Sequence, residues 1–247
     1  MPPDTLAQEP LYVVPLDTAV VGSCIRTYDE VDSTNRIALQ FGGDGSVFIA
    51  DAQRAGRGRH GRSWHSAPGL GLWFSVAFDQ PVDGLMFGAC LAVRDALRPW
   101  IAAQIDWPND LVAAGRKLCG ILIERRNERT ALGIGINVCH RPGDFPPELR
   151  GCATSVEAAS GRPCSRAELV RAVLTALDEK VIVLRSGGVD AVRQEWIAAC
   201  GVIGRRRRIG PLEGRVEAVD DTGALVIATP AGTRRVFVSG PNQGGGA

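Results

Sequence analysis

The sequence predicts an α+β protein in which a mixed β-sheet flanked by helices is followed by a small all-β unit. Strand-like apolar runs recur between residues 47 and 138, and a stripe of helical period over 83–101 interrupts them. Two amphipathic helices are predicted at 168–184 and 189–200. Beyond residue 201, short apolar or alternating runs are separated by turn residues, which is typical of a small barrel.

These observations divide the chain into four parts. We expect a proline-rich lead-in segment at 1–25, a large domain at 26–200, a small β domain at 201–240 and a flexible tail at 241–247. A chain of 247 residues with 45% hydrophobic and 22% charged residues can bury a full core.

Composition excludes several classes of protein. The formal net charge is +1, so no global field draws the chain to DNA or to membranes. There is no signal-peptide pattern and no membrane-length apolar stretch, and we expect a cytoplasmic protein. The cysteine count is odd and there is no CxxC pair, which indicates reduced, structural thiols. The seven cysteines stand at 24, 90, 119, 139, 152, 164 and 200.

The most informative segment is Gln53–Trp64, QRAGRGRHGRSW, with four arginines and three glycines. Arginine offers a planar fork of donors to carboxylate or phosphate oxygens, and glycine lets backbone N–H groups approach the same oxygens. A solvated surface loop or a nucleic-acid-binding segment would have a similar composition. Strand-like runs at Val47–Ala50 and Leu70–Phe78 flank the segment, which favours an unstructured loop, fixed at both ends, that closes over an anion.

Other polar residues stand at the ends of predicted elements. Val31–Leu39 is typical of a helix start with Ser33 or Thr34 as the cap, and these hydroxyls either only cap the helix or also bind a ligand. Asp106–Leu111 contains the turn Trp-Pro-Asn-Asp. A strand at Lys117–Glu124 begins with a lysine, and a strand at Ala131–Val138 carries an asparagine within an apolar run. Such isolated polar residues need hydrogen-bond partners or a ligand.

Five segments in this order resemble the biotin protein ligase family, which attaches biotin to carboxylases. They are Ser-Thr-Asn, Gly-Arg-Gly-Arg-x-Gly-Arg-x-Trp, Trp-Pro-Asn-Asp, Arg-Lys-Leu-x-Gly-Ile-Leu-x-Glu and Gly-Ile-Gly-Ile-Asn-Val. The resemblance covers about residues 26–240. It implies a class II synthetase-like catalytic domain of the biotin/lipoate ligase type, at 26–200, and an SH3-like barrel at the C-terminus.

The resemblance also implies the reaction and its residues. Family members use ATP and Mg²⁺ to convert biotin to biotinyl-5′-adenylate, and then transfer biotin to one lysine of a biotin carboxyl carrier domain of acetyl-CoA carboxylase or a related carboxylase. Carried over by motif, the catalytic residues are Arg57, Arg59, Lys117 and Asp110. The biotin-binding residues are Ser33, Thr34, Asn35, Gln53, Arg57, Gly58, Arg59, Lys117 and Gly120. The nucleotide-binding residues are Arg62, Trp64, Asn109 and Asn137.

Two of these roles stay open. Trp64 would pack against the adenine or support the loop that covers it. Asp110 would hold Mg²⁺ or orient the acceptor lysine, and it would otherwise be an aspartate that bonds its own turn.

The chain departs from the family at Asp106, where a lysine is usual. His60 is expected to be solvated, and Cys139-His140 lacks the further ligands of a metal site. The run Arg205–Arg208 is either a phosphate-binding patch or, as we favour, the charged edge of a strand.

Too few residues precede the motifs for the DNA-binding domain of some family members, so we expect no repressor activity. The oligomeric state, monomer or homodimer, is left open. A lipoate ligase and a non-enzymatic biotin-binding or nucleic-acid-binding module are the alternative functions.

Overall fold

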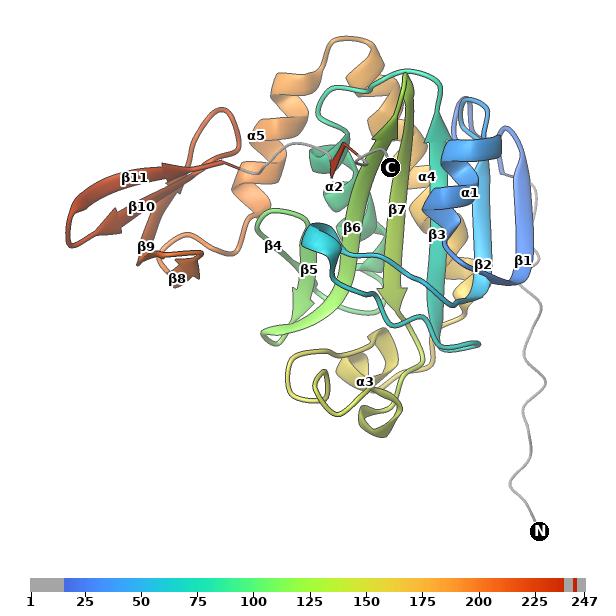
Figure 1. Cartoon of the computed structure of the whole chain (residues 1–247), viewed down its shortest axis with the longest axis horizontal. Helices are drawn as coiled ribbons and strands as arrows, with labels where there is room; N and C mark the ends of the chain where they lie inside the picture. Colours follow the sequence, from blue (N-terminus) through green and yellow to red (C-terminus); the bar gives the residue numbers. More distant parts are fainter. Residues whose placement is uncertain (1–15, 238–241, 244–247) are drawn as a thin grey trace.

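A single mixed sheet organises most of the chain (Figure 1). The computed structural model describes residues 16–237 and 242–243. The sheet order is β1-β2-β3-β7-β6-β5-β4, with β12 also pairing with β6. Its strands are β1 (Ile25–Val31), β2 (Val47–Gln53), β3 (Gly71–Phe78), β4 (Gln104–Asp106), β5 (Asp110–Ala113), β6 (Arg116–Arg126), β7 (Arg129–Asn137) and β12 (Asn242–Gln243). The β1–β2 and β6–β12 pairs are parallel, and the others are antiparallel.

Helices cover both faces of this sheet. Helix α1 (Thr34–Phe41) lies on one face, and α2 (Leu85–Leu97), α4 (Arg166–Arg185) and α5 (Val189–Ala199) gather on the other (Figure 1). A short helix, α3 (Val156–Ser160), lies beside the end of β7. All eight residues of β3 are buried, as expected for a central strand covered from both sides.

The predicted helices and strands are present, but α3, β4 and β12 were not predicted, and three further points concern β1, α1 and the C-terminal sheet. β1 was not predicted, because its sequence, IRTYDEV, is half charged and lacks a continuous apolar face. Ser33 stands at the predicted N-cap position of α1, but its hydroxyl makes no capping hydrogen bond. The position was predicted correctly, and the predicted bond is wrong. The residues at 201–237 form a four-stranded antiparallel sheet, and the SH3-like barrel stays a prediction.

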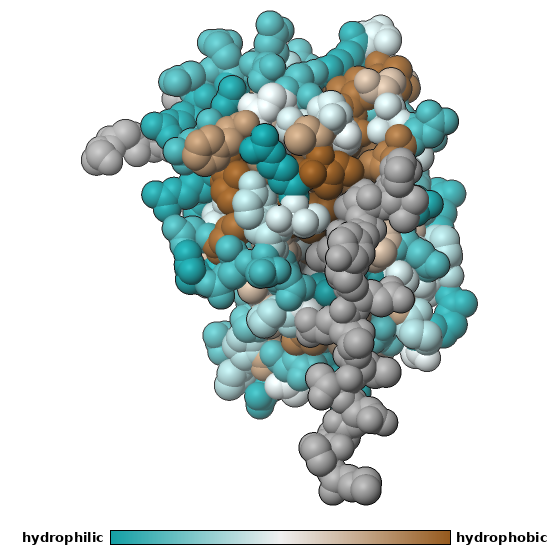
Figure 2. All heavy atoms as spheres, turned by 90° about the vertical axis from the view of Figure 1, so that its right-hand side faces the viewer, coloured by the Kyte–Doolittle hydropathy of each residue, from teal (hydrophilic) through white to brown (hydrophobic). Residues whose placement is uncertain are grey.

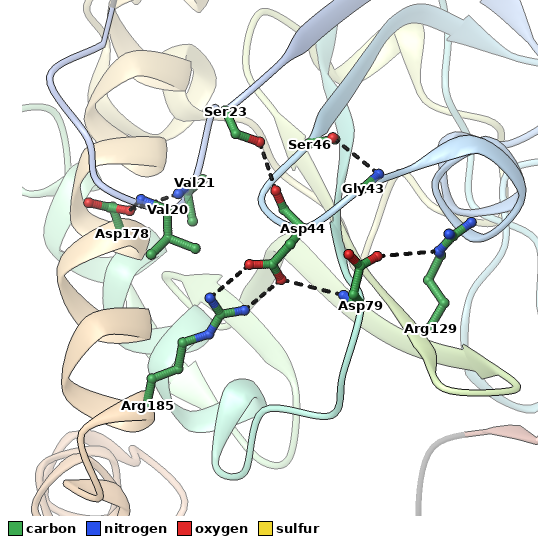
Figure 3. A network of polar contacts seen from close by, with 10 residues as sticks. All are labelled: Val20, Val21, Ser23, Gly43, Asp44, Ser46, Asp79, Arg129, Asp178 and Arg185. Carbon is green, nitrogen blue, oxygen red and sulfur yellow. Dashed lines mark hydrogen bonds and ion pairs between the residues drawn. The ribbon is translucent and has the colours of Figure 1, made fainter.

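The segment before β1 is held by helix α4. Asp178, only 5% exposed, accepts the backbone N–H groups of Ala19, Val20 and Val21 at 2.7–2.8 Å (Figure 3). In the same network, Arg185 of α4 pairs with Asp44 at 2.6 Å. Residues 16–24 of the predicted lead-in therefore pack on the large domain, while 1–15 and most of the predicted tail lie outside the described residues.

The C-terminal sheet has the order β11-β10-β9-β8. Its strands are β8 (Arg206–Ile209), β9 (Leu212–Val219), β10 (Leu225–Thr229) and β11 (Gly232–Val236). Strand β8, which contains most of the arginine run, lies at the edge, as favoured from the sequence. The indole of Trp107 donates to the backbone oxygen of Gly223 at 2.9 Å, which fixes this sheet to the end of β4.

Surface polarity varies around the molecule. The side with β1 carries apolar atoms in its upper half among mostly polar ones (Figure 2). Few large apolar side chains are exposed among the described residues, and the most exposed are Phe41 and Phe237, both at 60%. None of the helices described here combines the length and apolarity that crossing a bilayer requires.

Candidate active site

A cavity of about 280 Å³ lies beside α1 and over strands β6 and β7. Every site residue predicted from the sequence lines it, although these residues come from five separate segments. They are Ser33, Thr34, Asn35, Gln53, Arg57, Gly58, Arg59, Arg62, Trp64, Asn109, Asp110, Lys117, Gly120 and Asn137. The fold therefore gathers the three cations assigned to catalysis, Arg57, Arg59 and Lys117, around one cavity.

The sequence predicts an unstructured loop for residues 54–66, but this Arg/Gly loop is folded. Arg57 and Ser63 form an antiparallel bridge, and the Trp64 N–H donates to the Gly56 oxygen at 2.9 Å. The tip is a 3₁₀ turn over Arg59–Gly61, in which His60 has a left-handed backbone with φ 57°. Arg57 and Arg59 reach Glu124 and Asn109, and residues of the loop form one wall of the cavity.

Trp64 closes the loop onto the sheet through two glycines. A Cβ atom would lie 2.8 Å from its ring at Gly120 and 2.6 Å at Gly135. Trp73 meets the ring edge to face at 6.3 Å between centroids. Only the bare backbone of these glycines gives the indole room to lie this close. Trp64 thus packs on the sheet, and its role, against the adenine or in support of the loop, stays a prediction.

Lys117 stands at the start of β6 between Trp64 and Asp110. Its Nζ is 2.6 Å from Asp110 Oδ2 and 5.2 Å from the centre of the Trp64 ring. The other carboxylate oxygen, Oδ1, is buried without a hydrogen-bond partner among the described residues. Mg²⁺ in nucleotide sites is held by one or two carboxylates together with phosphates, so the free oxygen of Asp110 fits such an ion.

A chain of polar contacts forms the end of the cavity near α1. Gln53 Oε1 accepts from the Thr34 N–H at 2.9 Å and from the Thr34 hydroxyl at 3.2 Å. Ser75 of β3 donates to Asn35 Oδ1 at 2.6 Å. Thr34, Asn35 and Ser75 are all buried. The hydroxyl of Thr34 therefore joins a hydrogen-bonded network instead of capping α1.

Arg59 reaches the turn before β5. Its Nη1 donates to Asn109 Oδ1 at 3.1 Å, and Asn109 Nδ2 donates to the Ile121 oxygen at 2.7 Å. Burial lowers the pKa of the Arg59 guanidinium, but arginine stays charged at any physiological pH. Asn137 Nδ2 bonds the Thr154 oxygen at 3.0 Å. Both asparagines thus have partners within the protein, as expected for buried amides.

Comparison with known proteins identifies the family. Residues 27–139 match the model of the biotin/lipoate A/B protein ligase family, and residues 202–240 match that of the biotin protein ligase C-terminal domain. The biotin–[acetyl-CoA-carboxylase] ligase of Paracoccus denitrificans is 33% identical, over 81% of this chain and 92% of the relative. This chain belongs to the biotin protein ligase family.

Other members agree in sequence and in structure. The bifunctional ligase/repressor BirA of Bacillus subtilis is 31% identical, over 90% of this chain and 74% of its own length. The biotin protein ligase of Aquifex aeolicus, solved in complex with biotin and ATP, superposes with a TM-score of 0.78 at 27% identity. That comparison covers 87% of this chain and 96% of the relative. The sheet and helices described above are therefore the biotin ligase fold.

Sequence reasoning assigned no role to Glu124, although it lies within one of the family motifs. It stands near the end of β6, and its Oε2 lies 2.7 Å from Asn35 Nδ2 and 3.1 Å from Arg57 Nη2. Sequence reasoning also missed Ser75, which bonds Asn35, and the apolar wall of the cavity formed by Phe145 and Leu149. The signal available for Glu124 was an acidic residue near the end of an otherwise apolar strand. No comparable signal marked the others.

Asp106, which replaces the lysine usual in the family, points to the C-terminal sheet. It forms an ion pair with Arg207 of β8, and burial raises the pKa of its carboxyl while Arg207 opposes that effect. Part of the arginine run therefore holds the two sheets together. Arg207 of the C-terminal sheet thus pairs with Asp106, the residue at which this chain departs from the family pattern.

His140 is packed in the protein interior, and the cysteines, all within the described residues, form no disulfide. His140 is 1% exposed and stacks on Phe145 at 4.6 Å, and burial lowers its pKa to about 4. All seven cysteines are free, as predicted. Within 16–237 and 242–243, no three His, Cys, Asp or Glu side chains are grouped to hold a metal.

Proposed function

We propose that this chain activates biotin with ATP to form biotinyl-5′-adenylate and pyrophosphate, and that the ε-amine of a carrier-protein lysine then attacks the acyl carbon, forms an amide and releases AMP. The observation that carries the proposal is the meeting of Arg57, Arg59 and Lys117 with Asp110 in one cavity. Membership of the family supports the substrates, since the Aquifex relative is described with biotin and ATP.

The charges fit the first step. A free carboxylate is a poor acyl donor, because its charge repels nucleophiles and oxide is a poor leaving group. Its attack on the α-phosphorus of ATP brings two anions together, so fixed cations must neutralise the charge that develops. Lys117 and the two arginines are held by Asp110, Glu124 and Asn109, and they need little reorganisation to do so.

We assign the polar end of the cavity to biotin and the other end to the nucleotide. Ser33, Thr34, Asn35 and Gln53 offer hydroxyl and amide groups suited to the neutral, polar ureido ring. Gly58 and Gly120 let the backbone approach the ligand. Arg62, Trp64, Asn109 and Asn137 line the part assigned to ATP.

Mg²⁺, when bound, would neutralise phosphate charge and would be held by the free oxygen of Asp110 together with the phosphates. In the second step, Asp110 would orient the acceptor amine. The Arg/Gly loop would exclude water from the adenylate, which is a reactive mixed anhydride.

The partner we propose is a biotin carboxyl carrier domain of acetyl-CoA carboxylase or a related carboxylase. We also propose the division into a catalytic domain at 26–200 and a C-terminal domain at 201–240. A cytoplasmic location fits seven free thiols and the need for ATP. We expect no repressor activity, and titration of a biotin operator DNA tests this; sequence-specific binding would contradict it.

The deciding experiment is ATP–pyrophosphate exchange with biotin, with lipoate or with neither acid. Exchange that depends on biotin supports the proposal. Exchange with lipoate alone would identify a lipoate ligase, which the family model also includes. An absence of exchange with either acid, in a folded protein, would favour a binding module. Transfer is then followed by incubating the chain with biotin, ATP and a carrier domain, in which only the carrier lysine should be modified.

A further inference from the structure

Glu124 is nearly buried at the end of β6, behind the proposed active site. Its side chain is 11% exposed. It is not among the residues that line the cavity, but both of its side-chain partners, Asn35 and Arg57, are. Burial of a carboxylate is costly unless it is paired and hydrogen-bonded. Keeping a carboxylate at this position therefore costs folding free energy, which indicates a structural or functional role for Glu124.

The carboxylate joins three separate elements. Its Oε2 accepts from Asn35 Nδ2 of α1 at 2.7 Å and lies 3.1 Å from Arg57 Nη2 of the Arg/Gly loop. Residues from α1, the loop and β6 therefore meet at one oxygen atom. A shared acceptor of this kind fixes the loop and the helix relative to the sheet at the same time.

The first consequence concerns hydrogen-bond direction. An ionised carboxylate only accepts, so Asn35 must turn its NH₂ group to Glu124 and its carbonyl to Ser75. Ser75 donates to that carbonyl at 2.6 Å, and Thr34 Oγ1 lies 2.7 Å from the Ser75 hydroxyl. The network continues through Gln53 to Ser66, at the base of the loop. Glu124 thus sets the orientation of the amide at the biotin end of the cavity.

The second consequence concerns the loop. Arg57 is 45% exposed and could turn to solvent, whereas Glu124 could not. If the loop opened, a nearly buried carboxylate would lose its cation, which is unfavourable. The pair therefore favours the closed loop even before a ligand arrives.

We propose that Glu124 is a positioning residue: through Arg57 it holds the Arg/Gly loop closed, and through Asn35 it orients the biotin end of the cavity. It touches neither reacting atom. The part that concerns retention of the adenylate rests on the proposed function, while the part that concerns the loop does not.

The first test uses the free chain and needs no activity. Amide exchange of residues 54–66 is compared in the wild type, Glu124→Gln and Glu124→Ala. The Gln variant keeps an acceptor but loses the charge, and the Ala variant loses both. We expect exchange about tenfold faster in Glu124→Ala and an intermediate rate in Glu124→Gln. The Gln variant keeps the test decisive if the Ala variant does not fold.

A matched control is available on β2. Asp51 is another strand carboxylate paired with an arginine, Arg166, at 2.7 Å, but Arg166, unlike Arg57, does not line the cavity. We expect Asp51→Asn to leave loop exchange unchanged. Wild-type exchange rates in both Glu124 variants, or equal acceleration in Asp51→Asn, would overturn the proposal.

The second test measures release of preformed biotinyl-adenylate. We expect release about tenfold faster in Glu124→Ala, and in the Glu124→Ala/Arg57→Ala double variant an acceleration well below the product of the two single effects, because the two residues share the loop contact while the Asn35 contact belongs to Glu124 alone. Fully additive effects would remove Arg57 as the link. If the wild type forms no adenylate, the proposed function fails, and the exchange experiment still decides the role of Glu124.

Discussion

Replacing Gly135 by alanine tests whether the position of Trp64 matters to the proposed chemistry. Gly135 lies within β7, in an extended conformation that alanine also adopts. The added Cβ would lie 2.6 Å from the Trp64 indole. Non-bonded carbon atoms prefer about 3.5 Å or more, so the ring must move by about 1 Å. The substitution therefore displaces the loop with little change to the strand itself.

The substitution is expected to slow the reaction and to lower stability by no more than a similar free energy. A displacement of about 1 Å in a positioning element can reduce a rate by about a hundredfold, equivalent to roughly 2.7 kcal/mol. Overpacking costs about 1–3 kcal/mol, and alanine recovers about 0.5–1 kcal/mol relative to glycine in a strand. The free energy of unfolding should therefore fall by less than about 2.5 kcal/mol.

The assay is biotin-dependent ATP–pyrophosphate exchange, with denaturant unfolding measured on the same samples. Gly43→Ala is the control, because its Cβ would meet nothing closer than the Ser46 hydroxyl at 3.7 Å. We expect the control to retain wild-type kcat/KM. If Gly135→Ala also stays within about twofold of the wild type, the close packing of Trp64 is not required and the reasoning is refuted.

Three further predictions follow from the site. Lys117→Ala should abolish adenylate formation while costing under about 1 kcal/mol of stability, because its ion pair with Asp110 is partly exposed; undiminished pyrophosphate release would exclude Lys117 from the mechanism. Arg59→Gly removes the 3.1 Å bond to Asn109 and should release the adenylate early, so that bystander proteins become biotinylated; unchanged selectivity for the carrier would contradict this. Burial lowers the pKa of His140 to about 4, so between pH 6.5 and 4 the unfolded chain binds more protons than the folded one. The free energy of unfolding therefore falls as the pH is lowered through this range. His140→Phe should remove about 2 kcal/mol of the loss between pH 7 and 5 in denaturant unfolding, and an unchanged pH slope would count against this.

Much of the fold could be predicted because its central strands are continuous apolar runs. Strands β3, β6 and β7 are covered on both faces, so their sequences carry the signal directly. β1 lacks that signal, since it is an edge strand with charged residues facing solvent. A closed barrel could not be verified from strand count, because short alternating runs are compatible with an open sheet as well.

The site residues could be predicted by motif, but their contacts could not. Nothing in the sequence indicates that Trp64 would lie on Gly120 and Gly135, because that contact depends on how β6 and β7 are paired. The partners of Glu124 are 89 residues away at Asn35 and 67 away at Arg57, so local pattern carries no trace of them. For the same reason, the pairing of Asp106 with Arg207 emerges only when both domains are folded.

The close packing of Trp64 against the sheet makes its indole an intrinsic spectroscopic reporter. Its indole meets that of Trp73 at 72°, with 6.3 Å between ring centroids, and the Lys117 ammonium lies over it. Two chromophores held at a fixed angle produce a near-ultraviolet dichroism signal that vanishes when either one rotates freely. The proposed opening and closing of the loop can therefore be followed in unlabelled protein by near-ultraviolet circular dichroism.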